Sequence, residues 1–280
     1  MKILIRRPKG NRHSTSVIKA LIEGIECCGD VLVGDKMLKG PVLINKAYNY
    51  DAVALWSGRH LNHIKPIIDA GMDILMCELG YIGDRRKWIS IGWNGINGRA
   101  EFLIGKEPRW KKIWGKDILK PWNMNYDHAL IVGQIQKDLS VIDCPSILKW
   151  YEEMTKECLA LNLSVVFRRH PLDIWTAKNY CPKGATLDSS ESIDEAMQNA
   201  LVITYSSNVG VLATLAGRPI VAQNRTSMVY GLAAKNIKDV KAFDRKPWLH
   251  KMAYCQWHID ELRDGTAWRY LRTKYLDNQT

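Results

Sequence analysis

The sequence predicts an α/β protein built from two doubly wound units. Short apolar runs of strand length alternate with longer stretches whose apolar residues recur at helical spacing, and the alternation extends through most of the chain. A turn-rich, aromatic segment at 110–125 interrupts this alternation once, and the pattern restarts after it. Alternating strands and helices of these lengths favour largely parallel sheets.

The first predicted unit comprises residues 1–125. Its opening strand leads through a loop at 6–11 into a helix for which Ser14 is the candidate N-cap, because a serine hydroxyl can accept a bond from a free helical N–H group. Two further strands and one helix complete the unit. The predicted strands are 2–5, 51–56 and 72–77, and the predicted helices run from Ser14 through Ile22 and over 63–70.

The second predicted unit comprises residues 126–247, and a helical tail at 248–280 follows it. The tail is rich in Trp and Tyr, has a break at Gly265, and is expected to pack back on the first unit. The second unit repeats the alternation of strands and helices. Its predicted strands are 128–132, 163–167, 201–204 and 219–222, and its predicted helices are 146–161, 193–198 and 209–216.

Composition excludes several classes of protein. The 280 residues are 46% apolar and 25% charged, which excludes disordered and collagen-like chains. No apolar run approaches the ~20 residues of a membrane-spanning helix, and the basic start does not resemble a signal peptide, so we expect a cytoplasmic protein. The seven cysteines are scattered without a C-x-x-C pair, which predicts reduced thiols and no zinc site.

The positive charge is concentrated in the first half. Residues 1–125 carry 21 basic and 12 acidic side chains, a net charge of +9, whereas 126–280 carry 19 and 17, a net charge of +2. A basic half favours a polyanionic partner such as nucleic acid, because cations near phosphates release condensed counterions. A solvated basic surface is the alternative.

Two doubly wound units suggest a ligand site in a cleft between the carboxyl ends of their strands. One candidate loop is 167–171 (Phe-Arg-Arg-His-Pro), which directly follows a predicted strand. Two guanidinium groups beside an imidazole can hold phosphate oxygens. A charged turn is the alternative interpretation.

A second candidate loop is 204–210 (Thr-Tyr-Ser-Ser-Asn-Val-Gly), between a predicted strand and a helix. Hydroxyl and amide groups at a helix start can bind an anion. Helix capping by Ser207 or Asn208 is equally compatible with the sequence. The segment is not a P-loop, and no G-x-G-x-x-G follows the first strand.

A third candidate is the carboxylate of Glu78, at the end of the third predicted strand. A carboxylate at such an edge is suited to take a proton from an attacking hydroxyl, although a cap or surface salt bridge would use the same residue type. The stretch that follows, 91–99, holds three glycines and two asparagines, and we expect a shaped loop with positive φ angles there.

Taken together and in order, five segments resemble the capsule-polysaccharide transferase family, the Kdo-transferase-like branch of the GT-B glycosyltransferases. The matching segments lie between about residues 75 and 265. They are 78–81 (Glu-Leu-Gly-Tyr) with Trp-Ile-Ser at 88–90, 133–140 (Gly-Gln-Ile-Gln-Lys-Asp-Leu-Ser), 168–171 (Arg-Arg-His-Pro), 206–219 with its Gly-x-x-Ala-x-x-x-Gly-x-Pro pattern, and 254–257 (Tyr-Cys-Gln-Trp).

The resemblance implies a GT-B-like fold, in which two doubly wound Rossmann-like domains enclose a cleft. The second domain would bind a nucleotide sugar, most simply a UDP-sugar, without a metal, and Glu78 would be the catalytic base. Two departures narrow the activity: Leu212 stands where many GT-B enzymes have an acid for the ribose, and Leu79 replaces an Asp of Kdo transferases, so Kdo is not the expected sugar. The implied donor-binding residues are Gln134, Arg168, Arg169, His170, Ser206, Ser207 and Asn208.

The acceptor is predicted from charge, because the +9 half is the acceptor half. Basic residues are interleaved with Trp110 and Trp114, and they could track phosphates while an aromatic ring stacks on a displaced base. They are Lys106, Arg109, Lys111, Lys112, Lys116 and Lys120. We therefore expect a phage-type DNA glycosyltransferase that modifies a 5-hydroxymethylated pyrimidine. The alternatives are a capsule or lipid-glycan transferase of the same fold and a catalytically degenerate DNA-binding relative. The candidate DNA-binding residues are Arg6, Arg7, Lys9, Arg12, Arg85, Arg86, Arg99, Lys111 and Lys112.

Overall fold

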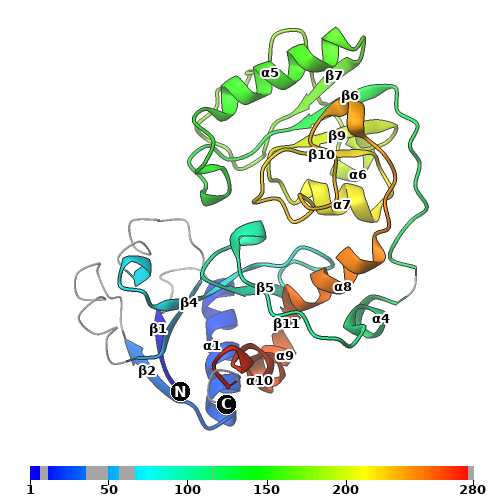
Figure 1. Ribbon diagram of the computed structural model, residues 1–280. Coiled ribbons are helices and arrows are strands. Elements are labelled where there is room, and N and C mark those ends of the chain that lie inside the picture. The colour runs from blue at the N-terminus through cyan, green and yellow to red at the C-terminus, as the bar shows by residue number, and fades with distance from the viewer. Residues whose placement is uncertain (7–11, 36–49, 57–66, 116, 277–280) are drawn as a thin grey trace. The chain divides into compact units, whose positions relative to one another are not determined.

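The computed structural model describes residues 1–6, 12–35, 50–56, 67–115 and 117–276. The chain divides into two compact units, of which the first comprises Met1–Ile113 with His250–Thr280 and the second comprises Trp114–Leu249. Each unit is a mixed α/β structure around one sheet (Figure 1). The predicted fold class, α/β with two Rossmann-like units of the GT-B type, is confirmed.

The first unit holds a six-stranded sheet in the order β11-β5-β4-β3-β1-β2. Strands β2, β1, β3 and β4 are parallel, β5 runs antiparallel to β4, and β11 runs antiparallel to β5. The strands are β1 (Lys2–Arg6), β2 (Val31–Asp35), β3 (Ala52–Trp56), β4 (Asp73–Leu79), β5 (Trp88–Trp93) and β11 (Gln256–His258). The short elements η1 (Asn97–Arg99) and α4 (Arg109–Trp114) follow β5.

Helix α1 (Arg12–Cys27) packs on this sheet through an apolar stripe at helical spacing. Val17, Leu21 and Ile25 are fully buried in the same hydrophobic core as β1 and β3. Ser14, predicted as the N-cap, instead lies inside the helix and is buried. It occupies the same face as Val17 and Leu21, and for that reason its side chain faces the core.

The C-terminal segment returns to the first unit and completes its sheet. It forms α8 (Lys246–Tyr254), which begins in the second unit, then β11, α9 (Ile259–Arg263), α10 (Thr266–Leu271) and α11 (Thr273–Leu276). Gly265 has a φ of 78° between α9 and α10, where the sequence predicted a break. The prediction of an entirely helical tail is wrong at 256–258, because these residues pair with Ser90, Ile89 and Trp88 as an edge strand.

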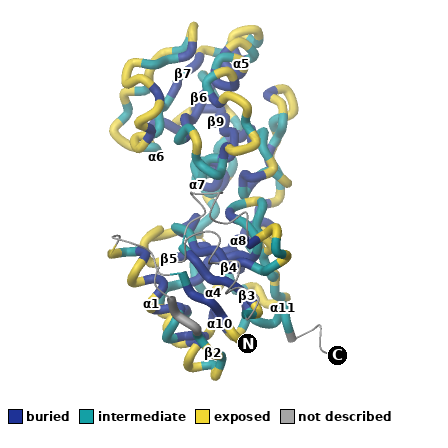
Figure 2. The backbone as a smooth tube through the Cα atoms, turned by 90° about the vertical axis from the view of Figure 1, so that its left-hand side faces the viewer, coloured by how far each residue is buried: buried dark blue, intermediate teal, exposed yellow. Residues whose placement is uncertain are grey.

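The second unit holds a five-stranded, all-parallel sheet in the order β10-β9-β6-β7-β8. Figure 2 shows β6 and β9 largely buried in the centre of this unit, whereas β7 is buried at only some of its residues. Ser146 caps α5 by accepting a bond from the Lys149 N–H. The elements are β6 (His128–Val132), η2 (Leu139–Val141), α5 (Ile147–Ala160), β7 (Ser164–Arg168), β8 (Thr186–Leu187), α6 (Ile193–Ala196), β9 (Ala200–Thr204), α7 (Val209–Leu215), β10 (Ile220–Ala222) and η3 (Ile237–Asp239).

The glycine-rich stretch 91–99 is a loop only after β5 ends at Trp93, and the predicted positive φ angles are present in it. Its first residues belong to β5, and positive φ angles occur at Asn94 (60°) and Asn97 (53°) rather than at its glycines. Gly92 is required for another reason, since a Cβ there would lie 2.7 Å from the side chains of Ala100 and Phe102. Close packing, and not turn geometry, therefore accounts for this glycine.

The contact between α1 and α9 provides a test of how the C-terminal segment docks. In Figure 1, α9 and α10 lie beside α1, and a Cβ on Gly24 would lie only 1.8 Å from the Leu262 carbonyl oxygen. We expect Gly24→Ala to lower the free energy of unfolding by about 1–3 kcal/mol through overpacking, although alanine alone would favour the helix by about 1 kcal/mol. Urea unfolding measures the change, with the exposed Ser16→Ala on the same helix as the control. Equal stability of the two variants would contradict this packing.

Candidate functional site

The carboxyl edge of the second sheet gathers three of the predicted segments. Strand β6 pairs in parallel with β7 on one side and β9 on the other, with Val132 opposite Arg168 and Ile131 opposite Ile203. The segments that follow these three strands therefore leave the sheet at the same edge. They contain Gln134, the Arg168–His170 loop and the Ser206 turn.

A buried glutamine ties two of these segments together. Gln134 is 4% exposed, its Oε1 accepts the Ser206 N–H at 2.8 Å, and its Nε2 donates to the Ser206 Oγ at 2.9 Å. The same Nε2 lies 3.4 Å from the Ser140 Oγ, and the Ser206 hydroxyl donates to the Ser140 carbonyl at 2.8 Å. Gln134 and Ser206 therefore bind each other and fix the shape of this edge.

The two arginines of the predicted loop also make contacts within the unit. Arg168 Nη1 donates to the Asp188 carboxylate and to the Ser190 carbonyl, whereas Arg169 Nη2 donates to the Asp173 carbonyl at 2.6 Å. Burial alone would raise the pKa of Asp188, but bonds from Ser190 and Arg168 outweigh it and hold this pKa below its usual range. Asp188 thus remains charged at neutral pH and balances Arg168.

His170 has a defined tautomer. Its Nδ1 accepts the Leu172 N–H at 3.1 Å, and a ring nitrogen that accepts a hydrogen bond carries no proton. A neutral His170 therefore holds its proton on Nε2. The Nε2–H group is a donor suited to a phosphate oxygen.

The Ser206 turn shows the capping interaction that the sequence left open. The Ser207 Oγ accepts the Val209 N–H at 3.2 Å, while Asn208, at the N-cap position of α7, makes no side-chain capping bond. Ser207 is therefore the residue that caps this helix. Helix α7 has only seven residues, so its dipole adds little to any anion site.

In the first unit, the Glu-Leu-Gly-Tyr segment ends β4 and bends sharply against β5. Gly80 donates its N–H to the Trp88 carbonyl at 2.8 Å, and a Cβ on Gly80 would lie 2.4 Å from that oxygen. Glu78 lies opposite Ser90 in β5 and is half-buried. No side chain other than glycine fits at position 80, which explains the spacing of this motif.

Gln256, from the C-terminal segment, anchors the end of the same motif. This fully buried side chain accepts the N–H groups of Tyr81 at 2.8 Å and Ile82 at 3.0 Å, and it donates to the Ile82 carbonyl at 2.8 Å. The Glu-Leu-Gly-Tyr and Tyr-Cys-Gln-Trp segments, separated by about 170 residues, therefore form one hydrogen-bonded structure.

Sequence reasoning missed His13, which packs against Trp56, the last residue of β3. The His13 ring packs edge-on against Trp56 with centroids 5.3 Å apart, and Trp56 pairs with Cys77, the neighbour of Glu78. Burial and the charge of Arg86 lower the pKa of His13, while Asp84 opposes this shift. The Glu78 carboxylate interacts electrostatically with Arg85, whose Nε donates to the Gly80 carbonyl at 2.7 Å.

The predicted basic residues divide into several groups. Arg12, Arg85, Arg86, Lys111 and Lys112 are exposed, Arg6 and Arg99 are half-buried, and Arg7 and Lys9 lie outside the described residues. Arg109, interleaved with the tryptophans, is instead bound to the Glu261 carboxylate and the Ala253 carbonyl and stacks on Trp257. With the C-terminal segment included, the first unit carries 24 basic and 15 acidic side chains, a net charge of +9.

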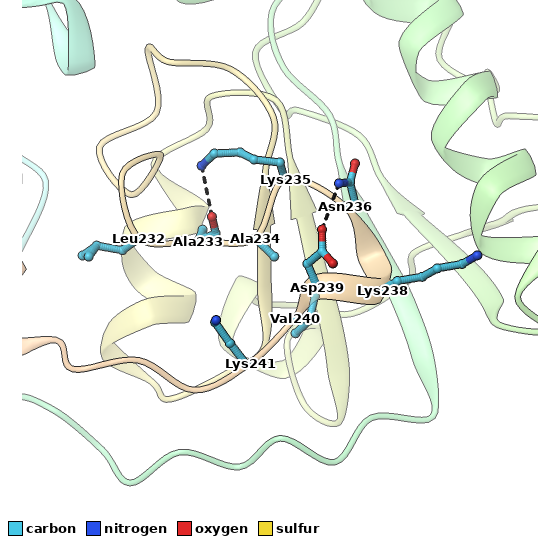
Figure 3. Close-up of a pocket in the computed structure, with 9 residues that line it drawn as sticks. All are labelled: Leu232, Ala233, Ala234, Lys235, Asn236, Lys238, Asp239, Val240 and Lys241. Atoms are coloured by element: carbon cyan, nitrogen blue, oxygen red, sulfur yellow. Dashed lines mark hydrogen bonds between the residues drawn. The ribbon is translucent and has the colours of Figure 1, made fainter.

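A hollow of about 610 Å³ lies elsewhere on the second unit (Figure 3). The segment from Leu232 to Lys241 lines it, and this segment contains none of the predicted site residues. In Figure 3, the Lys235 ammonium bends back to donate to the Ala233 carbonyl at 3.0 Å, and Asn236 donates to Asp239 at 2.9 Å. Three of the polar side chains that line the hollow, Lys235, Asn236 and Asp239, thus bond within their own segment.

The described residues offer neither a metal site nor a membrane-spanning helix. They contain no group of three or more His, Cys, Asp or Glu side chains placed to share a metal ion. Within the same ranges, no helix combines the length and apolar content that crossing a membrane requires.

Comparison with known proteins supports the fold. No family model matches the chain, and no curated protein sequence matches it. The structure of KpsC from Thermosulfurimonas dismutans, a β-Kdo 2,7 transferase, aligns with a TM-score of 0.59 and 14% identity over 98% of this chain and 99% of that chain. This chain therefore shares its fold.

Weaker similarities were found to two other solved structures. UDP-GlcNAc 2-epimerase from Methanocaldococcus jannaschii aligns with a TM-score of 0.36 and 12% identity over all of both chains. The glycosyltransferase SnogD from Streptomyces nogalater aligns with a TM-score of 0.30 and 10% identity over 97% of this chain and 99% of that chain.

The hydrogen bonds between Gln134 and Ser206 can be tested directly. We expect Gln134→Ala to lower the free energy of unfolding by about 1–3 kcal/mol, because the buried Ser206 N–H loses its acceptor. Hydrogen exchange at the Ser206 amide should accelerate relative to the wild type. The control is Gln198→Ala, which removes an exposed glutamine from the same unit. Unchanged exchange at Ser206 would show that the amide does not hold the turn.

Proposed function

We propose that the protein is a glycosyltransferase that uses a nucleotide-sugar donor. The observation that carries this proposal is the convergence of Gln134, His170 and Ser206 at one carboxyl edge of a parallel sheet. Ligands of open α/β sheets bind at such edges. The fold shared with a Kdo transferase and the resemblance of five ordered sequence segments to the same family support it.

In this proposal, the second unit binds the donor phosphates. The Nε2–H of His170 and the hydroxyl of Ser207 supply donors, and Arg168 adds its Nε and Nη2 groups, since its two described bonds use Nη1. Gln134, Ser206 and Arg169 hold the loops in shape, and Asn208 begins α7 beside them. Fixed donors stabilise the negative charge that develops on the leaving phosphate and need no metal for this.

The first unit is proposed to activate the acceptor. Glu78 takes the proton of the acceptor hydroxyl as its oxygen bonds to the anomeric carbon. The bond from that carbon to the donor phosphate oxygen breaks, and the nucleotide leaves with both bonding electrons. Arg85 and the strand pairing with β5 hold Glu78 at the edge where this proton transfer would occur.

DNA carrying a 5-hydroxymethylated pyrimidine is the proposed acceptor. The net charge of +9 on the first unit and its exposed Arg12, Arg86, Lys111 and Lys112 support a polyanionic substrate. A capsule or lipid glycan is the alternative acceptor, and a protein that only binds DNA is the alternative from another class. Leu212 motivates the alternative of a protein that only binds DNA. This leucine stands where many GT-B enzymes have an acidic residue that contacts the donor ribose.

The catalytic roles can be tested with isosteric and truncating substitutions. We expect Glu78→Gln and His170→Ala each to reduce sugar transfer on the order of 10²-fold or more, because they remove the base and a phosphate donor. Mass spectrometry of the acceptor measures the product, and circular dichroism verifies folding. The control is Glu26→Gln, an exposed carboxylate on α1. A protein that only binds DNA would retain its affinity in all three variants and transfer no sugar.

The acceptor can be tested by comparing two duplexes. With a panel of nucleotide sugars, the wild type should modify hydroxymethylated DNA and leave plain DNA unmodified. Replacing both Lys111 and Lys112 by Ala should reduce the slope of log K against log salt by about 0.9 for each phosphate that is no longer neutralised. Lys156→Ala, an exposed lysine on α5, serves as the control. Transfer to a glycan with no transfer to DNA would favour the alternative acceptor.

A further inference from the structure

The loop that follows His170 presents three large apolar side chains to solvent. Ile174 is 82% exposed, Leu172 66% and Trp175 54%. Among the described residues, Ile174 and Leu172 are the two most exposed large hydrophobic side chains. Single exposed apolar residues are common on protein surfaces, whereas three within four positions mark an interaction site.

A buried polar framework holds this loop in one conformation. Asp173 and Thr176 are both buried; the Asp173 Oδ1 accepts the Trp175 N–H at 3.1 Å, and its Oδ2 accepts the Thr176 hydroxyl. The Gln136 Nε2 donates to the Thr176 Oγ1 at 2.8 Å, and Arg169 donates to the Asp173 carbonyl at 2.6 Å. Because the polar side chains point inward, the apolar ones are held outward on an ordered tip.

The tip also carries positive charge. The Lys137 ammonium lies 4.0 Å from the centroid of the Trp175 ring, a cation–π contact that places a cation beside the exposed indole. Lys178 is exposed just beyond the loop. The carboxylate of the loop, Asp173, is buried and points away from the solvent-facing side chains. The surface formed by Leu172, Ile174, Trp175 and Lys137 is called the apolar tip below.

We propose that the apolar tip contacts an unstacked base of the DNA acceptor, with Lys137 beside a phosphate. This inference rests on the proposed function, because an enzyme that modifies a base must first remove it from the stack. Proteins that open base steps insert Leu, Ile and similar side chains between them. Exposed aromatic rings stack on bases of any sequence.

The size of the apolar tip favours a base over a larger partner. A specific protein interface buries about 800 Å² on each partner, formed by about 20–30 residues. The apolar tip has three apolar side chains on a short loop. One ring and two aliphatic groups match the area of a single base, and the adjacent cation matches its phosphate.

The experiment uses the full chain and a short hydroxymethylated duplex with 2-aminopurine beside the modified base. The wild type should bind this duplex and raise the 2-aminopurine fluorescence. We expect Trp175→Ala to weaken DNA binding about five- to a hundredfold, the range for removal of one base-stacking ring, and to abolish the fluorescence rise. Trp175→Phe should restore most of both, and Ile174→Ser should reduce the fluorescence rise. Lys137→Gln should lower the salt slope by about 1, whereas Trp175→Ala should leave it unchanged.

Val31→Ala is the matched control, because Val31 has the same 54% exposure as Trp175 but lies on an edge strand of the first unit. If Trp175→Ala behaves like this control while the wild type modifies the duplex, the apolar tip has no role in base contact and only this inference fails. If the wild type neither binds nor modifies the duplex, the proposed function fails and the inference with it.

Three further measurements separate the apolar tip from other roles. Loss of UDP binding in Trp175→Ala, without any effect on DNA, would assign the tip to the donor nucleotide. Weaker binding of Trp175→Ala to vesicles of phosphatidylglycerol and phosphatidylcholine would assign the tip to a lipid surface. A changed oligomeric state of this variant in sedimentation would assign the tip to contact with a second copy of the chain. Each of these results would overturn the proposed base contact.

Discussion

The parallel pairing of β6 with β7 and β9 is the constraint on which the second unit depends. It sends three separate stretches of sequence to the same edge of the sheet. Two of these stretches lie very close to each other at Gly133. The Gly133 N–H donates to the Arg168 carbonyl at 2.8 Å, and a Cβ on Gly133 would lie 3.0 Å from both that oxygen and the His170 backbone nitrogen. Glycine at 133 therefore allows the His170 loop to lie directly against the segment that carries Gln134.

Each unit fixes its candidate loop with the amide of one buried glutamine. Gln134 joins the ends of β6 and β9, and Gln256 joins the C-terminal segment to the turn after Glu78. An amide suits this task because it accepts and donates at the same time. A carboxylate would have no donor for the Ile82 carbonyl, and an apolar side chain would leave buried N–H groups without partners. The two segments that contain these glutamines therefore have a structural role in their units.

Local patterns predicted what local physics determines. The run at 128–132 forms β6 with the predicted bounds, and the predicted helix at 146–161 forms α5 with Ser146 as its N-cap, because N-cap preference and apolar spacing are both local. The strand at 256–258 was missed because its partner, β5, lies about 165 residues away in the sequence. Distance in sequence also explains two other differences. Arg109 was predicted to face phosphates but binds the remote Glu261, and His13 was missed because it packs on the remote Trp56.

The way this chain uses its arginines limits what a count of charges can reveal. Arg109, Arg169 and Arg245 all donate to carbonyl groups of their own unit, with Arg245 bonding Thr214 at 2.7 Å and Lys120 at 2.6 Å. A guanidinium that binds several carbonyls is fixed in place by the fold, so its charge cannot move to follow a ligand. Among the described residues, the cations that reach solvent are mainly lysines, whose long side chains can follow a phosphate backbone. If the acceptor is DNA, contact with an unstacked base calls for ordered aromatic and apolar side chains, which stack on a base whatever its sequence. An apolar loop held outward by Asp173 and Thr176 is one of the features of the described surface with that property.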